Sequence, residues 1–255
     1  FLASGEDPVA GPYATAIGRS LHAILAAARS EDGFIGESMY NHALSVLALA
    51  EAYGEVPDER IGPALQAGVR LLLRAQAGNA RGAWRYSPRS LDADVPVTSA
   101  CLIALAAAHE AGQNLPAASI EQATAFLLGC RNADGGFGYT GPGESGPPRT
   151  AAGALALALV HGPESPAVRT ACAYVANQGP GCAQYPFFYR LYAAPLLHLA
   201  DSATAAAWDR ENAAQLRATQ SAGGGWGGPQ GTAFSTAAAV LSLTAPECRL
   251  PGLAP

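Results

Sequence analysis

The chain has 255 residues, of which 49% are hydrophobic and 14% are charged, and its formal net charge is −5. A chain of this length can bury a substantial core, and the acidic balance leaves no basic face for a nucleic-acid partner. No run of 18 or more residues is purely apolar, so no transmembrane segment is expected. The sequence leaves open whether the protein is cytoplasmic or is exported with a processed end at Phe1, and whether a further hairpin precedes that residue.

Ten helical segments of two alternating kinds are predicted along the chain. The first kind is amphipathic: within 61–77, for example, Leu65, Val69 and Leu72 share one face. The second kind is apolar on every side, which is typical of a buried helix. The amphipathic segments are 13–28, 61–77, 117–130, 165–177 and 207–220. The apolar segments are 39–53, 97–110, 150–160, 187–200 and 232–243.

A turn that combines glycine with an aromatic residue separates the two helices of each pair. Four turns contain it clearly: Asp32-Gly33-Phe34, Gly82-Ala83-Trp84, Asp134-Gly135-Gly136-Phe137 and Gly224-Gly225-Trp226. A degenerate version runs from Gly179 to Tyr185, and the five aromatic residues recur at intervals of about 41 to 53 residues. We interpret Phe34, Trp84, Phe137 and Trp226 as structural wedges between repeats, in preference to ligand contacts.

Residues at the predicted helix ends support these boundaries. Gly54, Gly112 and Gly162 stand where apolar helices should stop, since glycine is favoured at the C-terminal cap of a helix. Thr98 and Thr150 lie near the starts of apolar helices, where a hydroxyl can accept a backbone hydrogen bond.

Five hairpins of an amphipathic outer helix and an apolar inner helix predict an all-α protein that forms one α/α toroid domain over residues 1–255. A linear helical solenoid is the main alternative. We prefer the toroid because small, Ala-rich inner faces allow the hairpins to close around an axis, and because solenoid repeats are usually shorter.

Several motifs carry a resemblance to a known superfamily. Gln76 with Trp84, and Gln220 with Trp226, resemble the Gln-Trp repeats of squalene-hopene cyclases, and Asp134-Gly135-Gly136-Phe137 resembles a turn of protein prenyltransferase β subunits. Nearly the whole chain resembles bacterial prenyltransferase/squalene oxidase repeat proteins. The segments that carry this similarity are Met39-Tyr40-Asn41-His42, Gly82-Ala83-Trp84-Arg85-Tyr86 and Asp92-Ala93-Asp94-Val95-Pro96-Val97-Thr98.

The resemblance implies a toroid that binds a hydrophobic, isoprenoid-type ligand. In class II terpene cyclases an Asp-x-Asp-Asp motif protonates an alkene, and by this match Asp94, with Asp92 beside it, would supply the acid. Val95 replaces the last aspartate of that motif. The alternative interpretation is that Asp92 and Asp94 cap the following helix and hold the turn, so whether the protein is an enzyme stays open.

Other chemistries of helical toroids lack their residues here. Zinc-dependent prenyl transfer needs an Asp-x-Cys signature, and thioester formation needs Cys-x-x-Gln, whereas this chain has Cys182-Ala183-Gln184. No metal and no cofactor are therefore expected. The five cysteines form no C-x-x-C pair and are interpreted as buried thiols, with a Cys172–Cys182 bridge as the alternative in an exported protein.

A set of polar residues falls in turns or near the starts of apolar helices, and it supplies the remaining candidate site. His42 is the candidate general base. The candidate ligand-binding residues are Tyr40, Tyr86, Arg85, Arg149 and Tyr189. Each of these side chains could instead make structural hydrogen bonds between repeats. The alternative function to a hydrophobic small-molecule ligand is a non-catalytic module that binds a protein or a glycan.

Overall fold

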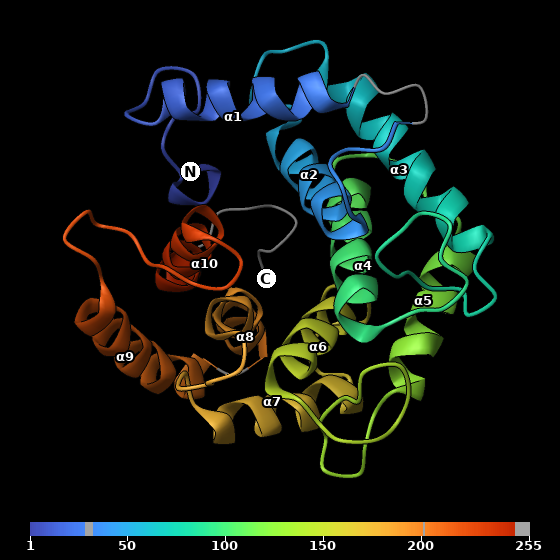
Figure 1. Ribbon diagram of the computed structural model, residues 1–255, viewed down its shortest axis with the longest axis vertical. Helices are drawn as coiled ribbons and strands as arrows, with labels where there is room; N and C mark the ends of the chain where they lie inside the picture. Colours follow the sequence, from blue (N-terminus) through green and yellow to red (C-terminus); the bar gives the residue numbers. More distant parts are fainter. Residues whose placement is uncertain (29–32, 201, 248–255) are drawn as a thin grey trace. The chain divides into compact units, whose positions relative to one another are not determined.

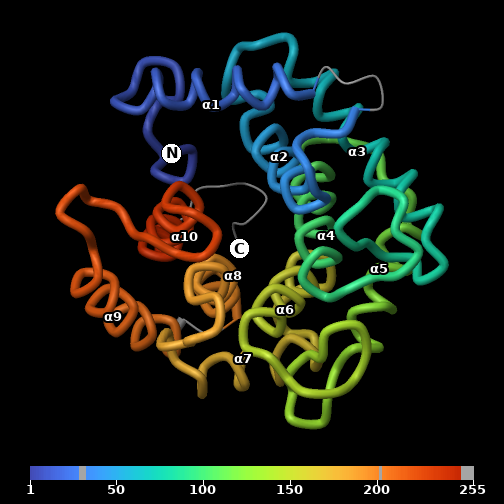
Figure 2. Tube along the Cα trace, viewed as in Figure 1, coloured from blue at the N-terminus to red at the C-terminus, as the bar shows by residue number. Residues whose placement is uncertain are grey.

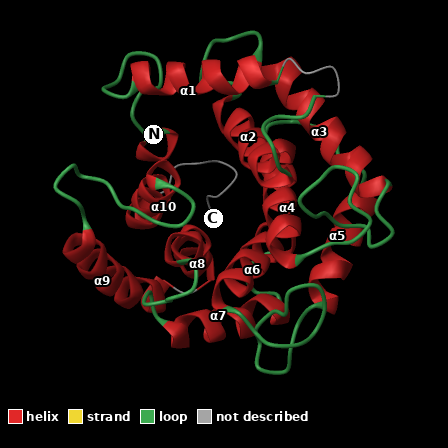
Figure 3. Ribbon diagram, in the orientation of Figure 1, coloured by secondary structure: helices red, strands yellow, loops and turns green. Residues whose placement is uncertain are grey.

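The computed structural model describes residues 1–28, 33–200 and 202–247, so the predicted turn residue Asp32 and the cysteine Cys248 lie outside the described residues. The described residues form ten α-helices and two short 3-10 turns, and they contain no strand beyond two isolated bridges (Figure 3). The protein is all-α, as predicted. The helices are α1 Ala14–Ala27, α2 Met39–Ala52, α3 Ile61–Ala77, α4 Val95–Glu110, α5 Ala117–Gly129, α6 Pro147–His161, α7 Pro166–Gln178, α8 Pro186–Ala200, α9 Ser202–Thr219 and α10 Thr232–Thr244.

The helices divide between two compact units. Unit 1 contains Phe1–Leu128 and unit 2 contains Gly129–Cys248. The organisation of residues 1–255 as a single domain stays a prediction.

In unit 1 the apolar helices α2 and α4 pack against each other, and α3 packs on both (Figure 1). Twelve of the 16 residues of α4 are buried, whereas only Ile17, Leu21 and Leu25 of α1 are. The many alanines of α4 allow neighbouring helices to approach on several sides. The predicted contrast between half-exposed and buried helices therefore holds for α1 and α4, whereas α2, predicted to be buried on every side, buries eight of its 14 residues.

In unit 2 α6 packs against α7 and α8, and α8 packs in turn against α9 and α10. The outer helix α9 buries a single stripe at helical spacing, formed by Ala205, Trp208, Asn212 and Leu216. The apolar helix α10 departs from the expectation of burial on every side, because Val240 and Leu243 are exposed.

The predicted stops of the apolar helices are confirmed by the backbone. Gly54, Gly112 and Gly162 follow the ends of α2, α4 and α6, and their φ angles are 90°, 82° and 81°. A residue with a side chain rarely adopts such angles, which explains why the chain has glycine at all three positions.

Three of the turns between paired helices share one hydrogen-bond pattern. A polar residue begins each turn, its carbonyl accepts the N–H of a glycine three positions later, and the aromatic residue follows two positions after that glycine. The three sets are Asn79, Gly82 and Trp84; Asn132, Gly135 and Phe137; and Ser221, Gly224 and Trp226. We call each of these segments a corner.

In each corner the aromatic residue is tied to the helix that follows it. The backbone N–H groups of Trp84, Phe137 and Trp226 donate to Oγ1 of Thr98, Thr150 and Thr236 over 3.2, 2.9 and 3.1 Å. The indole Nε1 atoms of Trp84 and Trp226 also donate backward, to the carbonyls of Leu72 and Leu216. These contacts link the outer helix, the turn and the inner helix into one hairpin.

The first turn uses different residues for the same purpose. Gly33 has the positive φ of the other corner glycines, so the position equivalent to Trp84 is Ile35, which is buried, and not Phe34, which is half-buried. The N–H of Ile35 donates to Nδ1 of His42 over 3.1 Å. The imidazole of His42 thus takes the place of the threonine hydroxyl.

Candidate binding site

Five of the residues singled out in the sequence meet in unit 1, where α4 begins beside the start of α2. They are Tyr40 from α2, Arg85, Tyr86 and Asp92 from the loop between α3 and α4, and Asp94 at the end of that loop. The chain path from α3 through this loop into α4 can be followed in Figure 2. We call the five residues the Arg85 cluster.

Asp94 is the N-terminal cap of α4. Its Oδ1 accepts the N–H of Val97 over 2.8 Å, its own N–H donates to the carbonyl of Trp84, and its side chain is fully buried. A carboxylate at this position satisfies an otherwise unpaired N–H of the first helical turn and interacts favourably with the helix dipole. The capping interpretation made from the sequence therefore describes what this side chain contacts.

Arg85 bridges the two aspartates of the cluster. Its Nε lies 3.5 Å from Oδ2 of Asp94, and its Nη1 donates to Oδ2 of Asp92. A backbone N–H and a guanidinium beside the Asp94 carboxylate both stabilise the charged form. A carboxyl group must hold a proton before it can protonate an alkene, and neither of these two contacts favours the protonated form.

Two tyrosines complete the cluster on the side of α2. The Arg85 guanidinium carbon lies 5.6 Å from the Tyr86 ring centroid, and the Tyr40 and Tyr86 ring centroids are 6.1 Å apart. The N–H of Met39, the first residue of α2, donates to the carbonyl of Tyr86 over 2.9 Å. The loop is thereby fixed to α2 as well as to α4.

The outward side of the cluster mixes apolar and charged groups. Tyr86 is 47% exposed and the Asp92 side chain is 62% exposed, while Leu91 between them in the loop is 75% exposed. Tyr86, Leu91 and Asp92 are thus among the exposed side chains of this loop.

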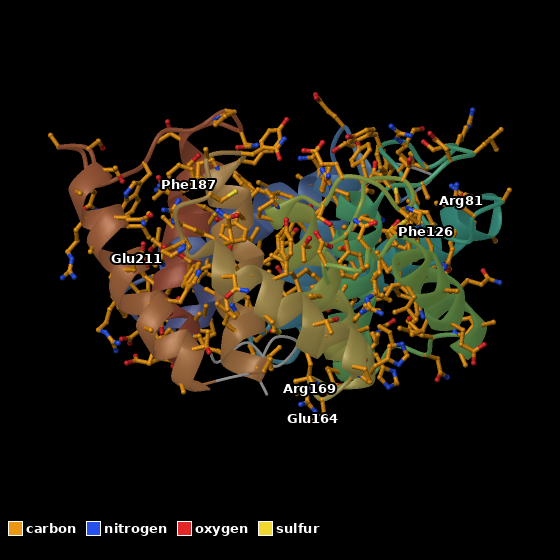
Figure 4. All side chains as sticks on the ribbon, turned by 90° about the horizontal axis from the view of Figure 1, so that it is seen from below. Arg81, Phe126, Glu164, Arg169, Phe187 and Glu211 are labelled. Carbon is orange, nitrogen blue, oxygen red and sulfur yellow. The ribbon has the colours of Figure 1, made fainter. Side chains whose placement is uncertain are left out.

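The loop that carries this surface is held from within by Asn79. Its Nδ2 donates to the carbonyls of Ser90 and Asp92 over 2.9 and 2.7 Å, and its Oδ1 accepts the N–H of Arg81. The Arg81 guanidinium in turn lies over the ring of Phe126, with its carbon 5.1 Å from the centroid (Figure 4). Both ends of the loop are thus anchored, so Tyr86 and Leu91 are presented on a fixed backbone.

His42, the candidate base, is fully buried away from this surface. Nδ1 accepts from the N–H of Ile35, which leaves Nε2 as the protonated nitrogen that donates to the carbonyl of Gly68 over 3.0 Å. Both ring nitrogens therefore bond to backbone groups of other segments. This arrangement ties α2 to α3 and to the first turn.

The remaining two candidates, Arg149 and Tyr189, lie in unit 2. Arg149 Nε donates to the carbonyl of Phe137 over 2.8 Å, so it secures the third corner. The hydroxyl of Tyr189 is within 3.1 and 3.0 Å of the carbonyls of Val175 and Gly179, and burial raises the pKa of this phenol. Both residues belong to unit 2, whereas the five residues of the Arg85 cluster belong to unit 1.

Sequence reasoning missed Asn79 and Leu91. Asn79 opens the loop and is buried although it is polar, and the only sequence signal for it is that Asn132 stands at the same position of the next corner. Leu91 gave a weaker signal, a single apolar residue between Ser90 and Asp92 in a loop.

The potential metal-ligating side chains of the described residues do not gather in one place. They contain no group of three or more His, Cys, Asp or Glu side chains that could hold a metal ion. The four cysteines that the structure describes are buried and unbridged, and burial together with nearby Asp94 raises the pKa of the Cys101 thiol. Within the same residues, no helix has the length and apolar character needed to cross a membrane.

No protein-family model matches the chain, and a search of curated proteins finds no significant match. Among solved structures, a protein from Actinoplanes is similar over 93% of this chain and 76% of its own, with a TM-score of 0.65 and 18% sequence identity. A variant of the type II terpene cyclase MstE from Scytonema is similar over 92% of this chain and 98% of its own, with a TM-score of 0.47 and 17% identity. The Actinoplanes structure shows a shared fold, and identities this low assign no function.

Proposed function

We propose that the protein acts by binding a protein partner through the outward side of the Arg85 cluster, without covalent chemistry there. The observation that carries this proposal is the engagement of Asp94: its carboxylate is buried, caps α4 and faces Arg85. The Asp94 carboxylate, which the sequence indicates as the candidate acid, thus holds the loop in place.

The composition of the exposed surface favours a protein as the partner. Tyrosine and arginine are enriched among the residues that contribute most to protein–protein binding, and Tyr86 and Arg85 are stacked in a fixed arrangement. Leu91, which precedes Asp92 in the same loop, is exposed and would be removed from water on binding. The ordered loop lowers the entropy lost on association, because its backbone is already held by Asn79.

A photo-crosslinking experiment tests the proposal. A photoreactive amino acid is placed at Leu91, and cells that naturally produce the protein are irradiated and analysed for covalent adducts. We expect one dominant protein adduct from this position. The matched position is Leu128, which is also an exposed leucine of unit 1 and should give no such adduct.

The same experiment in a Tyr86→Ala background separates a specific interface from chance contact. The adduct at position 91 should be lost in Tyr86→Ala and retained in Tyr53→Ala. Tyr53 is the matched control, because it is a tyrosine of the same unit with 48% exposure against 47% for Tyr86. Equal adduct yields from positions 91 and 128, or an adduct indifferent to Tyr86→Ala, would overturn the proposal.

We also propose that the helix pairs curl into the closed α/α toroid predicted from the sequence. The recurrence of the same corner geometry in both units supports this proposal. Small-angle scattering tests it, since a closed ring and an open arc of the same helices differ in radius of gyration. A profile that fits only an open arc would reject the toroid.

A hydrophobic ligand of isoprenoid type is the second candidate, and the aromatic content of α8 favours it. This apolar helix carries Phe187, Phe188, Tyr189 and Tyr192, and the rings of Phe188 and Tyr192 meet edge to face at 4.8 Å. Aromatic side chains suit apolar chains and cationic intermediates where they line a ligand site. Native mass spectrometry after incubation with a lipid extract tests the candidate, and the absence of a retained prenyl-chain mass would reject it.

A further inference from the structure

Unit 2 contains a buried arginine on α8. Arg190 is 7% exposed. Its Nε donates to Oδ1 of Asn212 over 2.8 Å, and its Nη2 donates to Oε1 of Gln215 over 2.7 Å. One edge of the planar guanidinium is therefore fully occupied by two amide oxygens of α9.

The orientation of both amides is fixed by further contacts. Nδ2 of Asn212 donates to Oγ of Ser242, which itself donates to the carbonyl of Ala239. Nε2 of Gln215 donates to Oε1 of Glu211 over 3.1 Å. Each amide nitrogen thus has its own acceptor, and each amide oxygen is directed at Arg190.

The charge of Arg190 has no carboxylate beside it. Among the described residues this guanidinium makes no ion pair, and Glu211 reaches it only through the neutral amide of Gln215. The Arg190 guanidinium carbon also lies over the ring of Phe187, 5.9 Å from the ring centroid. Phe187 and Glu211 are both labelled in Figure 4. Burial lowers the pKa of Arg190, as expected for a cation held away from water.

We propose that the remaining edge of Arg190 is a binding site for an oxyanion, either a carboxylate or a phosphate group. With Nε and one N–H of Nη2 occupied, the guanidinium keeps the N–H pair of Nη1 and Nη2, for which the described residues supply no acceptor. That pair has the spacing for two parallel hydrogen bonds to one carboxylate or phosphate. A bound anion would also neutralise the buried charge, which the protein itself leaves uncompensated.

Cys182 gives the site a local reporter. Burial raises the pKa of its thiol, while the positive charge of Arg190 acts in the opposite direction. An anion bound to Arg190 would cancel that stabilisation of the thiolate and slow the alkylation of Cys182. The buried thiol of Cys172 provides an internal reference in the same digest.

Calorimetric titration of the whole protein with inorganic phosphate and, separately, with acetate tests the site, with chloride at matched ionic strength as the reference. We expect saturable binding of one of the two anions, roughly tenfold or more weaker in Arg190→Met. Phosphate binding without acetate binding would identify a phosphate site, and the reverse a carboxylate site. Arg210→Gln, an exposed arginine on α9, should bind as the parent protein does.

A second variant keeps the test decisive if Arg190→Met does not fold. Gln215→Glu places a carboxylate against the guanidinium, so it should retain the fold, abolish anion binding and leave the alkylation rate of Cys182 insensitive to anions. The proposal is overturned if neither anion binds above the chloride reference. It is also overturned if Arg190→Met or Gln215→Glu binds as the parent does. This site lies in unit 2, so the outcome of its tests does not depend on the function proposed for the Arg85 cluster.

Discussion

Nε of Arg85 lies 3.5 Å from Oδ2 of Asp94, in a position where the aspartate is fully buried. The same carboxylate caps α4 through its other oxygen. One side chain thus joins the start of a buried helix to the loop that presents Tyr86 and Leu91. The consequence is that substitutions of Asp94 should be felt first in the stability of this loop.

Asparagine and alanine at position 94 should behave differently. Asp94→Ala removes the cap and the ion pair, and we expect it to lower the free energy of unfolding by about 1–2 kcal/mol. Asp94→Asn keeps an oxygen that can accept from Val97, so it should lose less. Urea unfolding of the two variants measures the difference, and equal losses would contradict the capping role.

His42 should prove to be structural. His42→Ala leaves the N–H of Ile35 and the carbonyl of Gly68 without their partner inside the core, and we expect a loss of about 2–4 kcal/mol in the free energy of unfolding. Chemical denaturation followed by circular dichroism measures this loss. A His42→Ala protein that unfolds at the parent's midpoint but has lost an activity would instead support a catalytic role.

The corner threonines should each contribute to stability. Thr98→Val and Thr150→Val preserve side-chain shape but remove the acceptor for the backbone N–H of Trp84 or Phe137, at a cost of about 1–3 kcal/mol each. Thr219→Val, at an exposed threonine of α9, is the matched control and should cost little. If all three variants unfold alike, the corner hydrogen bonds do not stabilise the hairpins.

The corners also show how far the sequence could predict the fold. Glycine followed by an aromatic residue located the turns, and Gly54, Gly112 and Gly162 located three helix ends, because both depend on local backbone conformation. The first turn was assigned to Phe34, whereas Ile35 occupies the buried position. The aromatic residue type favours Phe34 in the sequence. The hydrogen bond between the N–H of Ile35 and His42 shows that the equivalent position is one residue later, at Ile35.

The sequence predicted which residues form the candidate site better than it predicted what each side chain contacts. Tyr40, Arg85, Tyr86, Asp92 and Asp94 lie in neighbouring turns, so their proximity follows from the helix pairing. The partners of His42, Arg149 and Tyr189 are backbone groups, which a residue-type argument cannot reveal. Arg190 was missed because its amide partners are 22 and 25 positions away on the next helix.

Tyr189 should make stability depend on alkaline pH. Burial raises the pKa of its phenol above the ordinary value of 10.0, so this group contributes its full stability below pH 10. Above that pH the unfolded phenol ionises first, and the contribution falls as pH rises toward the folded pKa. Tyr189→Phe should therefore be less stable than the parent at pH 7, with a gap that narrows above pH 10. Thermal unfolding from pH 7 to 11 checks this, and a constant gap would contradict it.

The most direct test of the binding account compares the affinity of the cross-linked partner for Tyr86→Ala and Asp94→Asn side by side. The account predicts at least a roughly tenfold loss for Tyr86→Ala, since an exposed anchor is removed, and near-parent affinity for Asp94→Asn, since the cap is kept. The binding account would be contradicted if Tyr86→Ala retained its affinity and Asp94→Asn lost a measurable turnover. That result would support Asp94 as the proton donor.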